Sequence, residues 1–179
     1  MTRGRLIVAS LTGAVAVIAL VGAVWVYALG PVPLGKNLEY SHIVLDRDGR
    51  LLRAYATPDG RWRLPASAKD VDPRFLNLLF AYEDKRFRTH HGIDPLALGR
   101  AALQFSTSGH IVSGGSTLTM QVARLLEPRQ HRSFGAKLRQ LTRALQLEIA
   151  LGKDDILALY LTLAPYGGNL EGIRAASLS

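Results

Sequence analysis

Apolar side chains fill the first part of the chain without interruption, whereas they recur at short intervals in the rest. Residues 6–29 contain no charged side chain. A helix needs about 20 predominantly apolar residues to cross a bilayer, so this stretch predicts one membrane-spanning helix. Trp25 and Tyr27 stand near its C-terminal end, where amphipathic rings favour the membrane interface.

Two arginines, Arg3 and Arg5, precede the apolar stretch. Basic residues favour the cytoplasmic side of a span, which predicts a cytoplasmic N-terminus and places the chain after residue 30 across the membrane. A cleaved signal peptide is the alternative, since residues 28–30 include small side chains. Its apolar core is usually about 7–15 residues long. We therefore expect residues 1–30 to be a cytoplasmic tip and a retained anchor.

Short apolar runs separated by turn residues come next. The runs at 43–46, 51–56 and 61–64 predict three short strands, because turns rich in Asp and Gly stand between them. We expect residues 31–70 to form a linker and a small β element with a hairpin.

The last part of the chain has apolar positions at helical spacing. Asp72 and Asp94 each precede a proline, and an aspartate N-cap with proline at the first helical position favours a helix start. Ser133 precedes a long periodic stretch, and Ser116 or Thr117 is a candidate cap for another helix. Within a mainly α-helical domain at residues 71–179, helices are predicted over 73–83, 95–105, about 117–126, 134–151 and 153–163, and from 170 onward.

The charge balance favours an anionic partner. Lys and Arg number 22 against 14 Asp and Glu, and the formal net charge is +8. Nucleic acid, anionic lipid head groups and phosphorylated substrates all fit this balance. The chain has no cysteine, which excludes disulfides, thiolate metal sites and cysteine nucleophiles.

Two carboxylates stand where a predicted helix ends. Glu83 and Asp84 follow the largely apolar run at residues 76–81, which predicts a buried helix that emerges at the surface at Glu83. Partial desolvation favours the neutral form of a carboxylate and suits acid–base chemistry. The alternative is a solvated, charge-rich helix end.

The predicted helix at 134–151 carries two further candidate groups. Lys137 and Glu148 are eleven residues apart, close to three whole turns, so they share one face. Arg139 and Arg143 form a second basic row, suited either to a phosphate group or simply to solvent.

Three stretches together resemble the glycosyltransferase domain of class A penicillin-binding proteins, glycosyltransferase family 51. The resemblance covers about residues 42–179. Its motifs are Glu83-Asp84-x-x-Phe87-x-x-His90-x-Gly92, the run Gly114-Gly115-Ser116-Thr117-Leu118-Thr119-Met120-Gln121, and a third stretch with Lys153, Ile156-Leu157, Tyr160-Leu161, Gly167 and Gly172.

The resemblance implies a lysozyme-like glycosyltransferase domain, C-terminally incomplete here, on the periplasmic side of a bacterial inner (cytoplasmic) membrane. Such a domain polymerises lipid II into glycan strands with inversion, and undecaprenyl pyrophosphate leaves. The implied partners are lipid II, the growing glycan strand, the membrane and other cell-wall synthesis proteins, with no nucleic acid.

The resemblance also implies residue roles. Glu83 would be the catalytic base, and Asp84 would orient it or neighbouring basic groups. A divalent metal ion, Mg²⁺ or Mn²⁺, could share the neutralisation of the pyrophosphate, although no metal-ligand spacing is visible in the sequence. Substrate-binding roles fall on Phe87, His90, Gly115, Ser116, Thr117, Gln121, Lys137, Arg139, Arg143 and Glu148.

Two departures from the family pattern keep other functions open. The family motif Arg-Lys-x-x-Glu has Gln140 in place of its glutamate, so a second carboxylate is lacking or is supplied by Glu148; Thr162 replaces a common asparagine. A catalytically silent, membrane-anchored precursor-binding protein is one alternative. A lysozyme-like glycan hydrolase with Glu83 as general acid is another, but the basic row argues against it because a glycan contains no phosphate.

Overall fold

The computed structural model describes the backbone of residues 3–109, 114–128 and 133–178. The chain divides into two compact units, Met1–Val32 and Pro33–Ser179. The first unit holds helix α1 (Arg3–Ala28), of which Ser10–Ala28 is long and apolar enough to cross a membrane. A signal sequence meets the same criterion, so retention of this helix stays a prediction.

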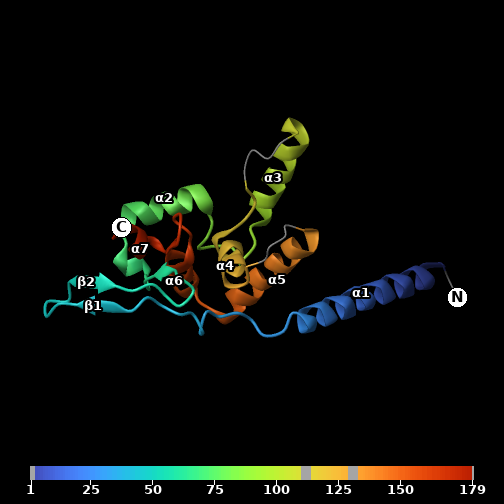
Figure 1. Ribbon diagram of the computed structural model, residues 1–179. Helices are drawn as coiled ribbons and strands as arrows, with labels where there is room; N and C mark the ends of the chain where they lie inside the picture. Colours follow the sequence, from blue (N-terminus) through green and yellow to red (C-terminus); the bar gives the residue numbers. More distant parts are fainter. Residues whose placement is uncertain (1–2, 110–113, 129–132, 179) are drawn as a thin grey trace. The chain divides into compact units, whose positions relative to one another are not determined.

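The second unit is mainly α-helical, as predicted (Figure 1). The helices α2, α3 and α4 precede α5, the longest of this unit, and α6 and α7 follow. The elements are β1 (Ile43–Leu45), β2 (Leu51–Ala54), β3 (Trp62–Arg63), the 3₁₀ turn η1 (Ala68–Asp70), α2 (Pro73–Glu83), α3 (Pro95–Ser108), α4 (Leu118–Leu126), α5 (Phe134–Ala150), α6 (Lys153–Leu163), β4 (Leu170–Glu171) and α7 (Ile173–Ser177).

Polar side chains cap the helices at the positions expected from the sequence. Each cap accepts a hydrogen bond from a backbone N–H that the first helical turn leaves free. These caps confirm the predicted starts of four helices. The bonds are Arg74 N to Asp72 at 2.7 Å, Ala97 N to Asp94 at 3.0 Å, Met120 N to Thr117 at 3.1 Å and Ala136 N to Ser133 at 3.1 Å.

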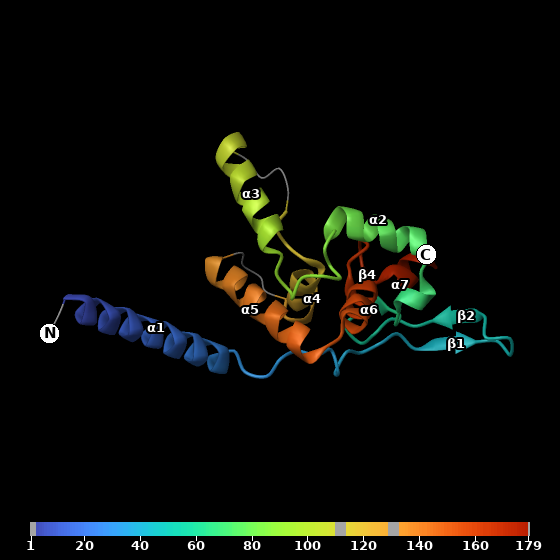
Figure 2. The ribbon, with the colours of Figure 1, turned by 180° about the vertical axis from the view of Figure 1, so that it is seen from behind.

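The hydrophobic core lies where α4 packs against α5 and α6 (Figures 1 and 2). Burying these side chains removes apolar surface from water and stabilises the fold. The hydrophobic core side chains from these helices are Leu118, Met120, Val122, Ala123, Ala144, Leu147, Ile156, Leu157, Leu161 and Leu163.

Helix α2 is not the buried helix that its apolar run predicted. Neither α2 nor α3 contains a buried residue, and the Leu78 side chain is 58% exposed. Both views show α3 projecting from the rest of the unit (Figures 1 and 2). Because α5 and α6 flank α4, α2 and α3 contribute little to the core.

The predicted β element is divided between two sheets. Strands β1 and β2 form an antiparallel hairpin, whereas β3 pairs in parallel with β4, from the end of the chain. Arg63 on β3 forms an ion pair with Glu171 on β4 at 2.7 Å. Segments on either side of residue 70 thus pair within the second unit, and the expected domain boundary there stays a prediction.

The predicted helix from residue 170 also begins later than expected. Leu170 and Glu171 form β4, and α7 starts at Ile173. Between them, Gly172 has a φ of +82° and lies where a Cβ atom would come within 2.5 Å of the Thr162 carbonyl oxygen. Only glycine suits this approach to the end of α6.

Candidate functional site

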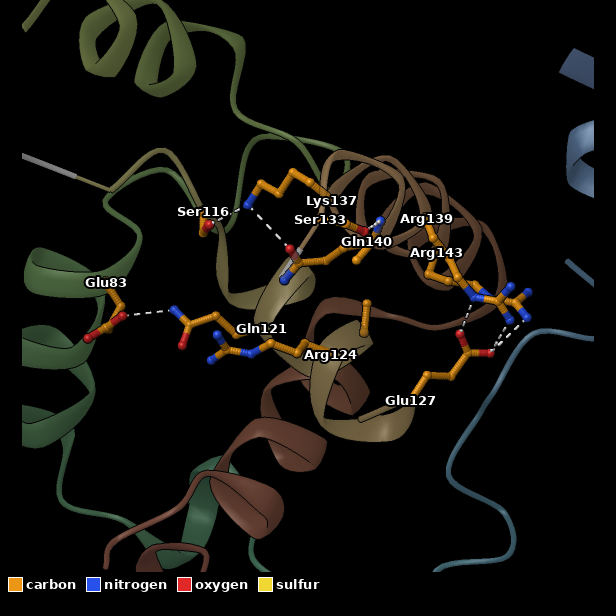
Figure 3. Close-up of a pocket in the computed structure, with 12 residues that line it drawn as sticks. Glu83, Ser116, Gln121, Arg124, Glu127, Ser133, Lys137, Arg139, Gln140 and Arg143 are labelled. Atoms are coloured by element: carbon orange, nitrogen blue, oxygen red, sulfur yellow. Dashed lines mark hydrogen bonds and ion pairs between the residues drawn. The ribbon is translucent and has the colours of Figure 1, made fainter. Parts of the chain in front are cut away.

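A pocket of about 470 Å³ lies between α4 and α5, with the end of α2 at its edge (Figure 3). A second pocket of about 310 Å³ shares Glu83 and Ser116 with it. Glu83 therefore stands where the two pockets meet. The first pocket is lined by Glu83, Ser116, Gln121, Ala123, Arg124, Glu127, Ser133, Ala136, Lys137, Arg139, Gln140 and Arg143.

Glu83 is the last residue of α2, and its side chain is exposed. The expectation of a partly desolvated carboxylate is wrong, because the apolar run before it packs at the edge of the unit rather than in the core. One carboxylate oxygen, Oε2, accepts a hydrogen bond from Gln121 Nε2 at 2.8 Å (Figure 3). Gln121 thereby orients Glu83 from α4.

Lys137 points from α5 toward the beginning of α4 (Figure 3). Its Nζ donates to Ser116 Oγ at 2.8 Å and to Gln140 Oε1 at 3.2 Å. Burial, reinforced by the positive charge of Arg124, holds the pKa of Lys137 below its ordinary value. Within the described residues no carboxylate pairs with Lys137, so its charge is available to a ligand.

Arg124 is a pocket residue that the sequence reasoning missed. It is exposed and lines the first pocket, and no described residue makes a hydrogen bond or ion pair with its guanidinium. It lies three residues after Gln121, and residues at that spacing share one helix face. That spacing was the available signal.

Glu127 is a second residue missed from the sequence. Burial by itself would raise the pKa of this carboxyl, but hydrogen bonds from Arg139 and Arg143 hold its pKa below the ordinary value. The ion pairs measure 2.8 Å to Arg139 Nε and 2.8 Å to Arg143 Nη2. The ion pairs join the end of α4 to α5. The partners lie 12 and 16 residues apart in the sequence, so no local pattern predicts their contact.

The predicted basic row is therefore largely engaged. The Arg143 side chain is 2% exposed and also donates to Gln146 Oε1 at 2.9 Å. Both arginines share one carboxylate, so this end of the pocket keeps a surplus of positive charge. The structure places Arg143 in a supporting ion pair rather than as an exposed cation.

Asp84 lines the second pocket, but its side chain is almost fully buried. Its carboxylate, 2% exposed, accepts hydrogen bonds from His90 Nε2 and Leu118 N, both at 2.9 Å. His90 Nδ1 accepts from Gly92 N at 3.2 Å, which places the imidazole proton on Nε2. Asp84 thus orients His90 and the first turn of α4, and it makes no hydrogen bond with Glu83.

Three predicted substrate-binding residues, Thr117, Phe87 and His90, are buried supports, although Thr117 also lines the second pocket. Thr117 Oγ1 donates to Gly92 O at 2.6 Å. The Phe87 ring, 1% exposed, stacks on Phe80, and His90 is 8% exposed. Gly115 packs closely against α3: a Cβ atom there would lie 2.8 Å from Leu98 Cδ2 and 3.3 Å from Leu98 Cα, so Leu98 would have to shift.

Glu148 is the fourth support and does not replace the missing glutamate. Its Oε1 accepts from Thr119 Oγ1 at 2.6 Å and from Lys153 Nζ at 2.7 Å, and its side chain is 6% exposed. Lys153 also donates to His90 O at 2.6 Å. Glu148 shares a helix face with Lys137, as predicted, but it lines neither pocket.

The pocket lining does not fit a dedicated divalent metal site. Mg²⁺ is usually held by one or two carboxylates together with substrate phosphates. Of the pocket's carboxylates, Glu127 is engaged by two arginines and Glu83 stands opposite Gln121. The described residues contain no group of three or more potential metal-binding side chains.

Comparisons with known proteins identify relatives of the whole site region. The transglycosylase family model matches residues 48–179. The chain is 52% identical over 149 residues to penicillin-binding protein 1C of Escherichia coli, which covers 83% of this chain and 19% of that protein. It is 40% identical over 134 residues to penicillin-binding protein 1A of Pseudomonas aeruginosa (75% and 16%), and 32% identical over 165 residues to penicillin-binding protein 1F of Bacillus subtilis (90% and 23%). The chain thus spans about a fifth of the length of these relatives.

Proposed function

Because this chain belongs to the transglycosylase family, we propose that it polymerises lipid II, the lipid-linked precursor of peptidoglycan, into glycan strands. The observation that carries the proposal is the position of Glu83 between a basic pocket and a second pocket. Glycosyl transfer from a lipid pyrophosphate needs a base for the attacking hydroxyl and positive charge for the leaving group.

The first pocket suits the pyrophosphate of the donor. Lys137 and Arg124 line it and have no carboxylate partner among the described residues. Ser116 and Gln121 add a hydroxyl and an amide at the same wall. A cation aimed at the leaving phosphate stabilises the negative charge that develops as the bond to C1 of the sugar breaks.

The second pocket suits the acceptor sugar. Its 4-hydroxyl attacks the anomeric carbon of the donor from the face opposite the phosphate, which inverts the configuration. Glu83 takes the hydroxyl proton, the C1–O bond breaks, and undecaprenyl pyrophosphate departs with the bonding electron pair. Glu83 reaches both pockets, which supports its role as the base at their junction.

A divalent ion, if it takes part, would be held chiefly by the pyrophosphate oxygens of the substrate. We propose no step that depends on it, because the lining offers no dedicated set of ligands. The catalytically silent binding protein is not favoured, because the chain belongs to the transglycosylase family. The glycan hydrolase is not favoured either, because its substrate contains no phosphate for Lys137 and Arg124 to bind.

The proposed location is the bacterial inner membrane, with α1 as a single anchor and the second unit on the periplasmic side. The length and composition of α1 support an anchor, and Arg3 and Arg5 support this orientation. A reporter fused after Ser179 should be active only outside the cytoplasm. Activity in the cytoplasm, or a mature N-terminus at Pro31, would contradict this assignment.

The direct test of function is incubation of the purified chain with fluorescent lipid II in detergent. Products separated by length should form a ladder of growing strands, with release of undecaprenyl pyrophosphate. The variant that tests the proposed base is Glu83→Gln, which should form no ladder. Its matched control is Glu39→Gln, which removes an exposed carboxylate that lines neither pocket. Shortening of preformed strands would support the hydrolase, and lipid II binding without turnover would support the silent binder.

A further inference from the structure

Gln140 lies between a backbone carbonyl of α4 and the ammonium group of Lys137. Its Nε2 donates to Met120 O at 2.6 Å, and its Oε1 accepts from Lys137 Nζ at 3.2 Å. A carbonyl oxygen only accepts and an ammonium only donates. These two neighbours therefore determine which end of the Gln140 amide faces each of them.

A glutamate at position 140 could not make both contacts. A carboxylate has no N–H for Met120 O, and its negative charge would repel that oxygen. It would instead form an ion pair with Lys137 and cancel one of the cations of the pocket. The family motif has a glutamate at this position. This chain therefore departs from the motif at the side chain that contacts the Lys137 ammonium, where glutamate in place of glutamine would add a negative charge.

Most other charged side chains of the pocket already have partners, which leaves Lys137 as one of the few cations that can bind an anionic ligand. Arg139 and Arg143 share Glu127. Arg124, on α4, has no carboxylate partner in the described part of the chain, and Glu83 accepts from Gln121. The charged groups that face the pocket are Glu83 at the end of α2, Arg124 and Glu127 around α4, and Lys137, Arg139 and Arg143 on α5.

Resting on the proposed function, we infer that Gln140 is a positioning residue of the donor site. It holds Lys137 beside Ser116 while leaving the whole positive charge of the ammonium to the phosphate groups of the lipid-linked donor. Neutralisation of the leaving group then falls to Lys137 and Arg124, because the second carboxylate of the pocket, Glu127, is already paired with Arg139 and Arg143.

The test compares Gln140→Glu and Gln140→Met in the full chain in detergent micelles. Gln104→Glu, on α3 and outside both pockets, is the control for an added negative charge. Binding of inorganic pyrophosphate is measured by calorimetry in the presence of EDTA. The titration of Lys137 is followed by NMR of ¹³C-labelled lysine, with Lys137→Arg to assign its signal.

Gln140→Glu should weaken pyrophosphate binding by about tenfold, because a new charge within a few ångströms opposes the ligand. It should also raise the pKa of Lys137 toward the value of a free lysine, since a nearby carboxylate favours the charged form. Gln140→Met removes the hydrogen bonds without adding charge, so its loss of affinity should be smaller, about threefold, without that rise. Gln104→Glu should change neither quantity.

Unchanged or tighter pyrophosphate binding by Gln140→Glu would overturn the inference, as would elongation that improves in this variant. Thermal unfolding identifies any variant that does not fold. If Gln140→Glu does not fold, Gln140→Met decides the test: wild-type affinity for pyrophosphate in that variant overturns the positioning role. A wild-type chain that binds no pyrophosphate also overturns it. Binding and titration as expected, without elongation of lipid II, would instead overturn the proposed function alone.

Discussion

Gln121 donates a hydrogen bond of 2.8 Å to one carboxylate oxygen of Glu83 and so joins α4 to the last residue of α2. The other oxygen, Oε1, makes no hydrogen bond with any described residue. One oxygen is thus oriented by the protein while the other remains available for a proton. This asymmetry is what a general base at the junction of two pockets requires.

Replacing Glu83 by glutamine should abolish strand elongation and leave lipid II binding nearly unchanged. Glutamine keeps the shape of the side chain but cannot take a proton, and general-base catalysis contributes roughly 10²–10⁴-fold. Single-turnover rates and direct binding of lipid II separate the two effects. Near-normal elongation by Glu83→Gln would exclude Glu83 as the base.

Asp84→Asn should act on stability more than on chemistry. The Asp84 carboxylate accepts hydrogen bonds from His90 and Leu118 N in a buried position. An amide can serve only one of these donors well, and an unsatisfied buried polar group costs about 1–3 kcal/mol. Denaturant unfolding should show this loss. Unchanged stability with elongation abolished would instead give Asp84 a direct part in the reaction.

Lys137→Met should stabilise the fold at neutral pH. Burial and Arg124 lower the pKa of Lys137 in the folded chain, so the unfolded chain binds this proton more tightly. The charged lysine therefore reduces stability below its folded-state pKa, and this loss disappears as pH rises through that pKa toward the ordinary value of 10.5. The midpoint of thermal unfolding should rise at pH 7, with a smaller gain in alkaline solution. An equal effect at every pH would contradict this explanation.

Lys137→Ala should weaken donor binding more than Glu148→Ala does. Lys137 lines the pocket, whereas Glu148 is engaged with Thr119 and Lys153 behind it. Glu148→Ala should instead lower the free energy of unfolding by about 1–3 kcal/mol, since Lys153 loses its carboxylate partner. Affinities for lipid II and for a phosphate-free glycan distinguish the cases: only lipid II should be affected by Lys137→Ala.

Removal of divalent metal ions should leave elongation within about tenfold of its original rate, because the cations of the pocket carry the neutralisation. The measurement is the rate of lipid II polymerisation after dialysis against EDTA, with Mg²⁺ or Mn²⁺ added back. Complete loss and full recovery would show that a metal ion is essential despite the lining of the pocket.

Local signals in the sequence determined most of the secondary structure. Asp72, Asp94 and Ser133 cap their helices as predicted, because an N-cap bond joins residues only two or three positions apart. The bounds of α6 match their prediction for the same reason. The shared face of Lys137 and Glu148 follows from the helical repeat alone.

Tertiary packing decided the properties of the individual site residues. The sequence placed Glu83 at a helix end, but its exposure depends on which helices enclose the core. Glu127 meets Arg139 and Arg143 only because α4 packs against α5, and β3 pairs with a strand about a hundred residues later. Such contacts join side chains far apart in the chain, so no local pattern encodes them, and whether a charged group is free for a ligand is known only from its neighbours in space.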